Sequence, residues 1–234
     1  ARHGAARGRC ARKAPCALMP RLTLTCEAIL FDLDGVLVDS RAVVERTWRR
    51  WAQRHGRDGG EILRKAHGRR TIDTVRDVAP DLDAEAELRW LEAAELNEKE
   101  GLVALPGAAA VLLAVPDARR AVVTSGGRAL ATLRMRVAGL TMPSVLVAAE
   151  DIENGKPAPD GYVLAASRLG VDPGDCVVIE DSPPGIAAGR AAGARVIAVP
   201  TTFAADRLSD AHVIVPSLQR IRVSSDARCL RVEV

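Results

Sequence analysis

Aromatic residues are scarce in this 234-residue sequence, which contains three Trp, two Phe and one Tyr. Because hydrophobic residues still make up 48% of the chain, its core must be built mainly from aliphatic side chains. Long apolar runs are missing as well. The segment 101–115 is interrupted by Pro106 and Gly107, whereas a membrane-spanning helix needs about 20 apolar residues. The sequence therefore predicts a globular protein with no membrane partner.

The five cysteines form no CxxC pair and lie in no His-rich cluster. This spacing predicts neither a zinc site nor a disulfide framework and favours a reducing compartment, so we expect a cytoplasmic location. The length allows one large domain, or a domain that carries a smaller one, and excludes a long repeat array.

The formal net charge of +3 has its origin at the N-terminus. Residues 1–18 contain five basic residues and no acidic one, and removing these five charges leaves −2 for the rest of the chain. This stretch has no helical apolar stripe and no apolar segment of secretory-signal length. We therefore expect residues 1–22 to be a disordered basic tail with the native start at Met19 and no nucleic-acid partner. A nucleic-acid-binding arm and a transit peptide are the alternatives.

From Thr23 onward, short β-rich segments alternate with helical stretches, which is typical of a parallel sheet covered by helices on both faces. The expected strands are Ala28–Asp32, Ala121–Thr124, Val145–Ala148, Cys176–Glu180, Arg195–Val199 and Val213–Val215. Between Ser40 and Pro106 no strand is expected, because three or four helical patterns follow one another there. We therefore predict an α/β fold. A Rossmann-like parallel sheet core, residues 23–40 and 103–234, carries an inserted helical cap subdomain, residues 41–102.

Polar residues gather at four places, three of them at the ends of expected strands. They are Asp32 and Asp34; Thr124, Ser125 and Gly126; Lys156; and Glu180 with Asp181. In open α/β sheets the ligand site lies beyond the carboxyl ends of the strands, so we expect these side chains to meet. A carboxylate can attack phosphorus, a second one can carry the proton, and carboxylate oxygens suit Mg²⁺. With a lysine and a hydroxyl to neutralise phosphoryl oxygens, the set predicts phosphoryl transfer.

Four motifs, in this order, closely resemble those of the haloacid dehalogenase-like superfamily of phosphatases. They are FDLDGVLVDS at 31–40, VVTSGG at 122–127, GKPAPDGY at 155–162 and VVIEDSPPGIAAGRAAG at 177–193. The resemblance implies that Asp32 is the nucleophile and Asp34 the general acid/base. It implies phosphate binding by Thr124 and Lys156, to which we add Ser125 and Gly126. The implied Mg²⁺ ligands are Asp32, the main-chain carbonyl of Asp34, Asp181 and Glu180.

The helical block after the first motif is similar to the cap of the phosphoglycolate phosphatase and β-phosphoglucomutase-like branch. The segment 67–74, HGRRTIDT, resembles the cap loop of sugar phosphatases that act on small phosphorylated polyols, including glycerol-3-phosphatases and 2-deoxyglucose-6-phosphatases. The implied partner is a small phosphorylated sugar or polyol, with Arg69 or Arg70 contacting it. We therefore expect a phosphatase that works through an aspartyl phosphate.

Several alternatives stay open. A phosphosugar mutase of the β-phosphoglucomutase type is disfavoured because the position expected to carry its cap histidine is Val44. A phosphoglycolate phosphatase is a further alternative. A signalling receiver domain is disfavoured, because receiver domains have no helical insert after the first strand. Glu180 is either a direct metal ligand or an organiser of its neighbours, and Asp39 with Ser40 is interpreted as a helix N-cap pair. We expect a monomer or weak dimer.

Overall fold

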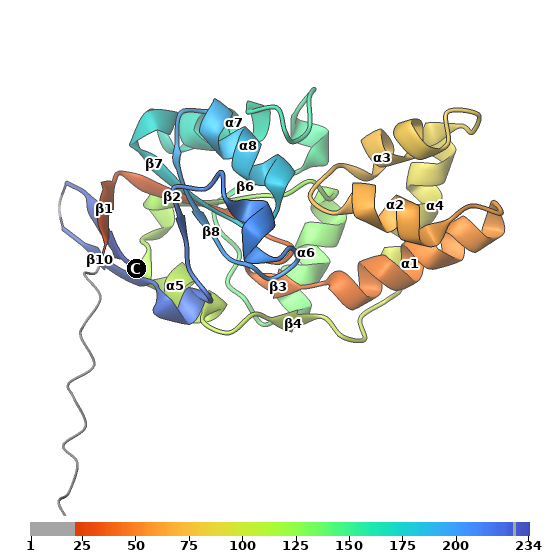
Figure 1. Ribbon diagram of the computed structural model, residues 1–234. Helices are drawn as coiled ribbons and strands as arrows, with labels where there is room; N and C mark the ends of the chain where they lie inside the picture. Colours follow the sequence, from red (N-terminus) through yellow and green to blue (C-terminus); the bar gives the residue numbers. More distant parts are fainter. Residues whose placement is uncertain (1–21, 227) are drawn as a thin grey trace, which may run out of the picture.

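The computed structural model describes residues 22–226 and 228–234. Its centre is a six-stranded sheet in which every neighbouring pair of strands is parallel (Figure 1). The strand order is β6 (Val145–Val147), β5 (Arg120–Val123), β2 (Ala28–Asp32), β7 (Cys176–Glu180), β8 (Arg195–Ala198) and β9 (Val213–Ile214). The predicted tail lies outside the described residues except for Leu22.

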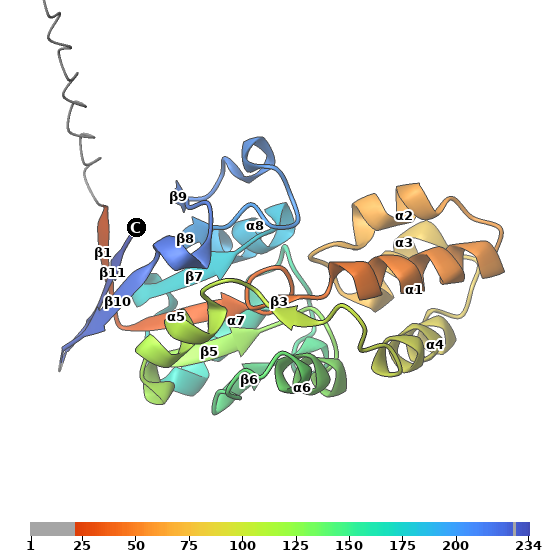
Figure 2. The same ribbon diagram turned by 90° about the horizontal axis from the view of Figure 1, so that it is seen from below.

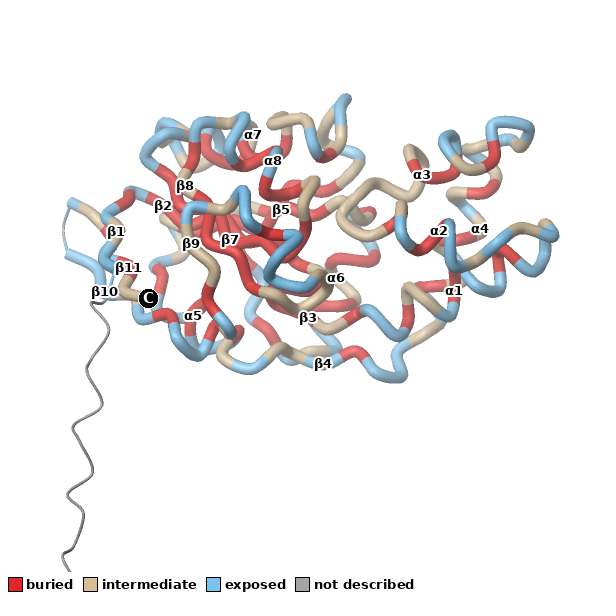
Figure 3. Tube along the Cα trace, viewed as in Figure 1, coloured by how far each residue is buried: buried red, intermediate tan, exposed pale blue. Residues whose placement is uncertain are grey.

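The central strands are buried on both faces, as their aliphatic composition predicts (Figure 3). Alternate residues of β2 point to opposite sides: Phe31 joins one hydrophobic cluster and Leu30 the other. The first cluster includes residues of α5 (Ala108–Ala114) and α6 (Arg128–Val137), and the second includes residues of α7 (Asp160–Leu169) and α8 (Pro183–Ala191). Helices therefore cover both faces, and the predicted α/β fold is confirmed.

All six expected strands are present, with ends that differ by at most one residue. A second, antiparallel sheet was not expected from the sequence. It consists of β1 (Thr23–Cys26), β11 (Leu230–Glu233) and β10 (Arg222–Ser225). These strands carry charged or hydroxyl residues on an exposed face, so their composition does not distinguish them from loops. Only alternate residues such as Leu230 and Val232 enter the core.

Residues after Ser40 form four helices that lie to one side of the sheet (Figures 1 and 2). They are α1 (Arg41–Arg54), α2 (Gly59–Ala66), α3 (Thr71–Val78) and α4 (Ala84–Leu96). Asp58 and Asp83 begin α2 and α4 by accepting hydrogen bonds from backbone N–H groups of the first turn. The four helices pack around a separate hydrophobic cluster that contains Trp48 and Trp51. We call residues 41–102 the cap, and these limits remain a prediction.

The expectation that no strand lies between Ser40 and Pro106 is wrong. Strand β4 (Val103–Ala104) pairs antiparallel with β3 (Val38–Asp39) where the chain leaves and re-enters the core. Each strand has two residues, which is too short for an alternating pattern to appear. Short 3₁₀ turns occupy Asp117–Arg119, Ala149–Asp151, Pro173–Asp175, Ala205–Leu208 and Leu218–Arg220. None of the helices in the described part of the chain is long and apolar enough to span a membrane.

Candidate active site

The site lies where the carboxyl ends of β5, β2 and β7 meet. After β2 the chain enters the cap and returns to β5 on one side, while β7 pairs with the other side of β2. This change of direction opens a crevice at the ends of the strands. A cavity there is lined by residues of both the sheet and the cap, among them Asp32, Asp34, Thr124 and Asp181.

Lys156 lies between two buried carboxylates. Its Nζ donates to Oδ1 of Asp32 and, at 2.7 Å, to Oε1 of Glu180. Burial alone would lower the pKa of Lys156, but the two carboxylates outweigh this effect and raise the pKa well above its ordinary value. Lys156 is therefore a fixed positive charge beside Asp32.

Glu180 has both carboxylate oxygens engaged. Oε1 accepts from Lys156 and from the hydroxyl of Tyr162 at 2.9 Å. Oε2 accepts from the N–H groups of Asp181 and Ser182 at 2.8 and 3.0 Å, and from the Ser182 hydroxyl at 3.0 Å. A Cβ on Gly185 would lie 1.6 Å from Oε1, so helix α8 also encloses the carboxylate. Of the two interpretations left open by the sequence, this environment favours Glu180 as the residue that positions Lys156.

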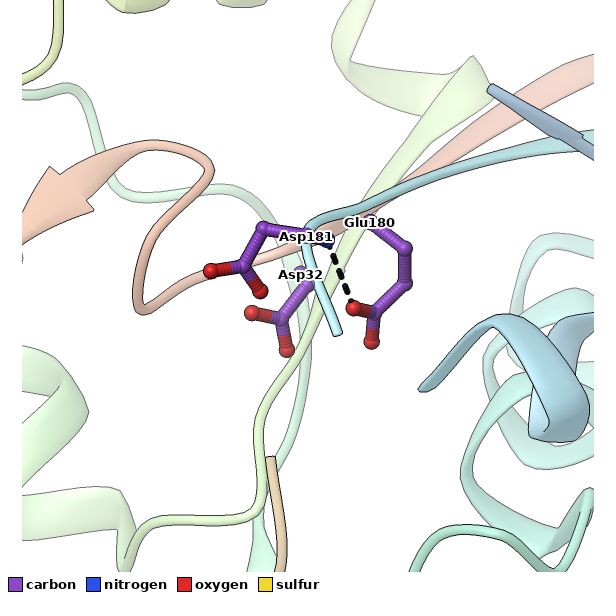
Figure 4. Close-up of side chains that lie close together, drawn as sticks. All are labelled: Asp32, Glu180 and Asp181. Atoms are coloured by element: carbon purple, nitrogen blue, oxygen red, sulfur yellow. Dashed lines mark hydrogen bonds between the residues drawn. The ribbon is translucent and has the colours of Figure 1, made fainter. Parts of the chain in front are cut away.

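Asp181 differs from Glu180 because its Oδ2 is buried without a hydrogen-bond partner in the described structure. Burial, with the neighbouring charges of Glu180 and Asp32, raises its pKa well above the ordinary value. A Cβ on Gly35 would lie 1.8 Å from this Oδ2, and Gly35 has a φ of +84°. Position 35 therefore requires a glycine, both for lack of space and for its left-handed backbone conformation. Carboxylate oxygens of Asp32, Glu180 and Asp181 all lie within 4.8 Å of one another (Figure 4).

The pKa of Asp32 is raised to about 8. Burial is the largest cause, Lys156 opposes it, and Glu180 and Asp34 add to it. A carboxyl group must be ionised to act as a nucleophile, so this site favours the binding of a further cation next to Asp32 and Asp181. The unpaired Oδ2 of Asp181 and the hard oxygen donors fit Mg²⁺.

The carboxylate of Asp34 turns toward the cap side of the cavity. Its Oδ1 accepts from the Ser40 hydroxyl at 2.6 Å, and its Oδ2 accepts from Nη1 of Arg134 at 2.7 Å and, at 3.4 Å, from the Thr124 hydroxyl. Ser40 precedes α1 but makes no side-chain cap. Instead Asp39 accepts from the Arg41 N–H at 3.2 Å. The interpretation of Asp39 and Ser40 as a cap pair is therefore wrong for Ser40, because its hydroxyl reaches Asp34.

The second motif contacts the cap as well as the cavity. Thr124, Ser125 and Gly126 all line the cavity. The Gly126 N–H donates to Oγ1 of Thr124 at 3.0 Å, and the Ser125 hydroxyl donates to the carbonyl of Gly68, in the cap loop, at 3.1 Å. The second motif is therefore joined directly to the cap.

The two cap arginines have different positions. Arg69 lines the cavity and donates to Asp77 at 3.1 Å. Arg70 is absent from the lining of this cavity. It donates twice to Asp73, at 2.7 and 3.1 Å, and once to the carbonyl of Ile152 in the core. The structure therefore brings Arg69 to the site and places Arg70 between the cap and the core.

Comparison with known proteins gives a family match. Residues 26–193 match the haloacid dehalogenase-like hydrolase family. The chain belongs to this family. Hexitol phosphatase A of Escherichia coli is 44% identical over 206 residues, which cover 86% of this chain and 95% of the relative. Glycerol-1-phosphate phosphohydrolase 2 of Saccharomyces cerevisiae is 36% identical over 217 residues, 86% of each chain.

Solved structures agree with this assignment to the haloacid dehalogenase-like hydrolases. A putative β-phosphoglucomutase from Bacteroides vulgatus superposes with a TM-score of 0.70 at 30% identity, covering 82% of this chain and 84% of its own. A hydrolase from Pseudomonas syringae has a TM-score of 0.74 at 24% identity, covering 82% and 94%, and this likeness shows the fold alone. The predicted family and enzyme class are confirmed.

Three residues of this haloacid dehalogenase-like site were missed by the sequence analysis: Glu95, Arg134 and Tyr162. Tyr162 lies in the third motif, where an aromatic hydroxyl near Lys156 was a usable signal. Arg134 and Glu95 lie on amphipathic helices, where a charged residue is usually solvated. In the folded chain α4 packs against α6, and both side chains are buried.

Proposed function

We propose that this chain is a Mg²⁺-dependent phosphatase that hydrolyses a small phosphorylated sugar or polyol through an aspartyl phosphate on Asp32. The observation that carries this proposal is the position of Lys156. Its ammonium is hydrogen-bonded to Asp32 and held there by Glu180, so a positive charge accompanies the nucleophile. A fixed cation at this point can neutralise the phosphoryl oxygens as charge shifts during transfer.

In the first half-reaction, a carboxylate oxygen of Asp32 forms a bond to phosphorus while the bond from phosphorus to the substrate oxygen breaks. Asp34 gives its proton to the departing oxygen, which leaves as an alcohol. The hydroxyls of Ser40 and Thr124 and the guanidinium of Arg134 position the Asp34 carboxyl group during this transfer.

In the second half-reaction, a water oxygen bonds to phosphorus and the bond to Asp32 breaks. Asp34, now a carboxylate, accepts the proton of that water and returns to its starting form. The products are inorganic phosphate and the dephosphorylated alcohol, and both carboxyl groups are regenerated. The hydrogen bond from the Ser125 hydroxyl to the Gly68 carbonyl holds the cap loop against the site, which reduces the access of bulk water during this step.

Asp32 and Asp181 are the side chains that we assign to Mg²⁺, with the main-chain carbonyl of Asp34 as the third protein ligand implied by the resemblance. Glu180 is left out because its two oxygens already accept five hydrogen bonds. When bound, the ion supplies positive charge that favours the ionised form of Asp32 and neutralises phosphate oxygens. Arg69, on the cavity wall, is the cap residue assigned to the substrate.

The substrate class is supported by the relatives, whose names specify hexitol and glycerol-1-phosphate phosphatases. A mutase must retain the phosphate and return it to a second hydroxyl, and Val44, at the position of the missing histidine, lines the cavity with an apolar side chain. We propose further that the enzyme is cytoplasmic and is a monomer or weak dimer. We also propose that it has no nucleic-acid partner, because the chain outside residues 1–18 carries a formal net charge of −2.

Phosphate release from a panel of polyol, sugar and glycolate phosphates, with and without Mg²⁺, tests this proposal. We expect turnover of polyol or hexose phosphates, loss of activity in excess EDTA and recovery when Mg²⁺ is restored. Full activity in EDTA would contradict the metal assignment. If the Mg²⁺-loaded protein releases phosphate from none of the esters, the proposed function is wrong.

A further inference from the structure

A buried ion pair forms part of the cavity wall on the cap side. Glu95 lies near the end of α4 and Arg134 lies on α6. Both side chains are only 6% exposed. One terminal nitrogen of Arg134 donates to Oε2 of Glu95, and the other donates to Oδ2 of Asp34 at 2.7 Å. One guanidinium therefore separates Glu95 from the proposed acid/base.

The two side chains are charged although both are buried. A buried ion pair contributes little net stability compared with apolar residues of similar volume, because both charges must be desolvated. Burial raises the pKa of Glu95, and Arg134 opposes this effect. A charged pair kept at the wall of a cavity, rather than in the middle of the cap core, points to a role toward the ligand.

Glu95 has one oxygen available for that role. Its Oε2 is bonded to Arg134, and within residues 22–226 and 228–234 no hydrogen bond involves Oε1. Arg134, in contrast, has both terminal nitrogens committed to carboxylates. The wall therefore offers a hydrogen-bond acceptor with negative charge, and the positive charge of its arginine is shared between two carboxylates.

We propose that Glu95, held by Arg134, selects substrates whose leaving group carries hydroxyls and no second anionic group. The inference rests on the proposed function and names the substrate class of that site. A hydroxyl of the leaving group donates to Oε1 of Glu95. A second phosphate or a carboxylate at the same place would meet a like charge in a partly desolvated cavity. Such repulsion lowers binding by about 10- to 100-fold.

Two phosphate esters of nearly equal size test this selection in the unmodified protein. Hydroxyethyl phosphate ends in a hydroxyl and phosphoglycolate ends in a carboxylate, while both have the same phosphate group and two-carbon chain. We expect kcat/KM for hydroxyethyl phosphate to exceed that for phosphoglycolate at least tenfold, mainly through KM. Equal or reversed values would overturn the proposal without any mutation.

Glu95→Gln removes the charge and keeps the shape and an oxygen that can accept from Arg134. We expect the preference for hydroxyethyl phosphate over phosphoglycolate to fall about tenfold or more, while turnover of nitrophenyl phosphate changes much less. Glu85→Gln is the matched control, because Glu85 lies on the same helix and pairs with Arg76 at 3.3 Å on the surface. Its selectivity should equal that of the unmodified protein.

The outcomes separate this inference from the proposed function. If no phosphomonoester is hydrolysed, the proposed function fails. If nitrophenyl phosphate and hydroxyethyl phosphate are hydrolysed but Glu95→Gln leaves the selectivity unchanged, only the role of Glu95 is wrong. Thermal unfolding establishes whether the variant is folded, and a variant that does not fold leaves the substrate pair in the unmodified protein as the deciding test.

Discussion

The two walls of the cavity are built in different ways. At the end of the sheet, Asp32, Lys156 and Glu180 come from the first, third and fourth motifs and form a buried network in which nearly every oxygen has a partner. At the cap wall, Glu95 of cap helix α4 meets Arg134 of core helix α6, and this contact depends on how the cap lies on the core. The residues proposed for the chemistry are therefore placed by strand ends, whereas those proposed to select the substrate are placed by the packing of the cap on the core.

This contrast predicts that variants of the sheet wall lose the reaction for all esters, while variants of the cap wall change the ranking of esters. Asp32→Asn has the largest expected effect. The amide keeps the shape of the side chain but is a poor nucleophile, so kcat should fall by about 10⁴- to 10⁶-fold for every ester. Steady-state kinetics on polyol and nitrophenyl phosphates measures this, with circular dichroism as the check on folding. A loss restricted to one class of ester would contradict the contrast.

Asp34→Asn should have the next largest effect on kcat. Its proton matters most when the leaving group is a poor one, so kcat for alkyl phosphates should fall by about 10²- to 10⁴-fold and that for nitrophenyl phosphate should fall less. The ratio of the two losses is the measured quantity. Equal losses for both esters would argue against Asp34 as the acid.

Arg69 and Arg70 have different expected roles within the cap. Arg69 faces the cavity, so Arg69→Ala should lower kcat/KM for the best polyol phosphate by about 10- to 100-fold, through loss of charge-assisted hydrogen bonds. Arg70 connects Asp73 and the carbonyl of Ile152, so Arg70→Ala should lower the free energy of unfolding more than it changes the ranking of esters. Steady-state kinetics and chemical denaturation of both variants measure these two effects. A loss of stability in Arg69→Ala together with a changed ranking of esters in Arg70→Ala would contradict the two assignments.

The smallest expected effect comes from a second contact between cap and core, where Glu92 approaches Glu150. A Cβ on Gly127 would lie 2.6 Å from Oε1 of Glu92 and 3.1 Å from Oε1 of Glu150. Burial, followed by the charge of Glu150, raises the pKa of Glu92. A raised folded-state pKa means that stability is lost as the pH rises through that pKa.

We therefore expect Glu92→Gln to increase the free energy of unfolding at pH 7 by at most about 0.5 kcal/mol, because solvent screens a half-exposed pair. The difference between variant and parent should vanish below about pH 4, where Glu is protonated in both the folded and the unfolded states. Urea denaturation at several pH values measures this difference. A variant that is less stable than the parent at pH 7 would show that the two carboxylates do not repel each other.

Sequence alone predicted the sheet and the chemistry at its edge because both depend on local signals. Each central strand is a short aliphatic run, and the polar residues after it must lie at the sheet's carboxyl edge. The hydrogen-bond network around Glu180 could not be predicted from the sequence, because it depends on how Ser182, Tyr162 and Gly185 enclose one side chain in the folded protein. Ser40 was misinterpreted for a related reason: its position before α1 suggested a helix cap, whereas in the folded chain its hydroxyl donates to Asp34, six positions earlier.

In the proposed mechanism, Asp32 carries the phosphoryl group during turnover. Rapid acid quenching followed by borohydride reduction converts an aspartyl phosphate to homoserine, which peptide mass spectrometry can locate in the chain. We expect homoserine at position 32, only when a phosphate ester and Mg²⁺ are both present, and none in Asp32→Asn. Turnover with homoserine at another position, or with none under conditions that trap the intermediate, would contradict this account.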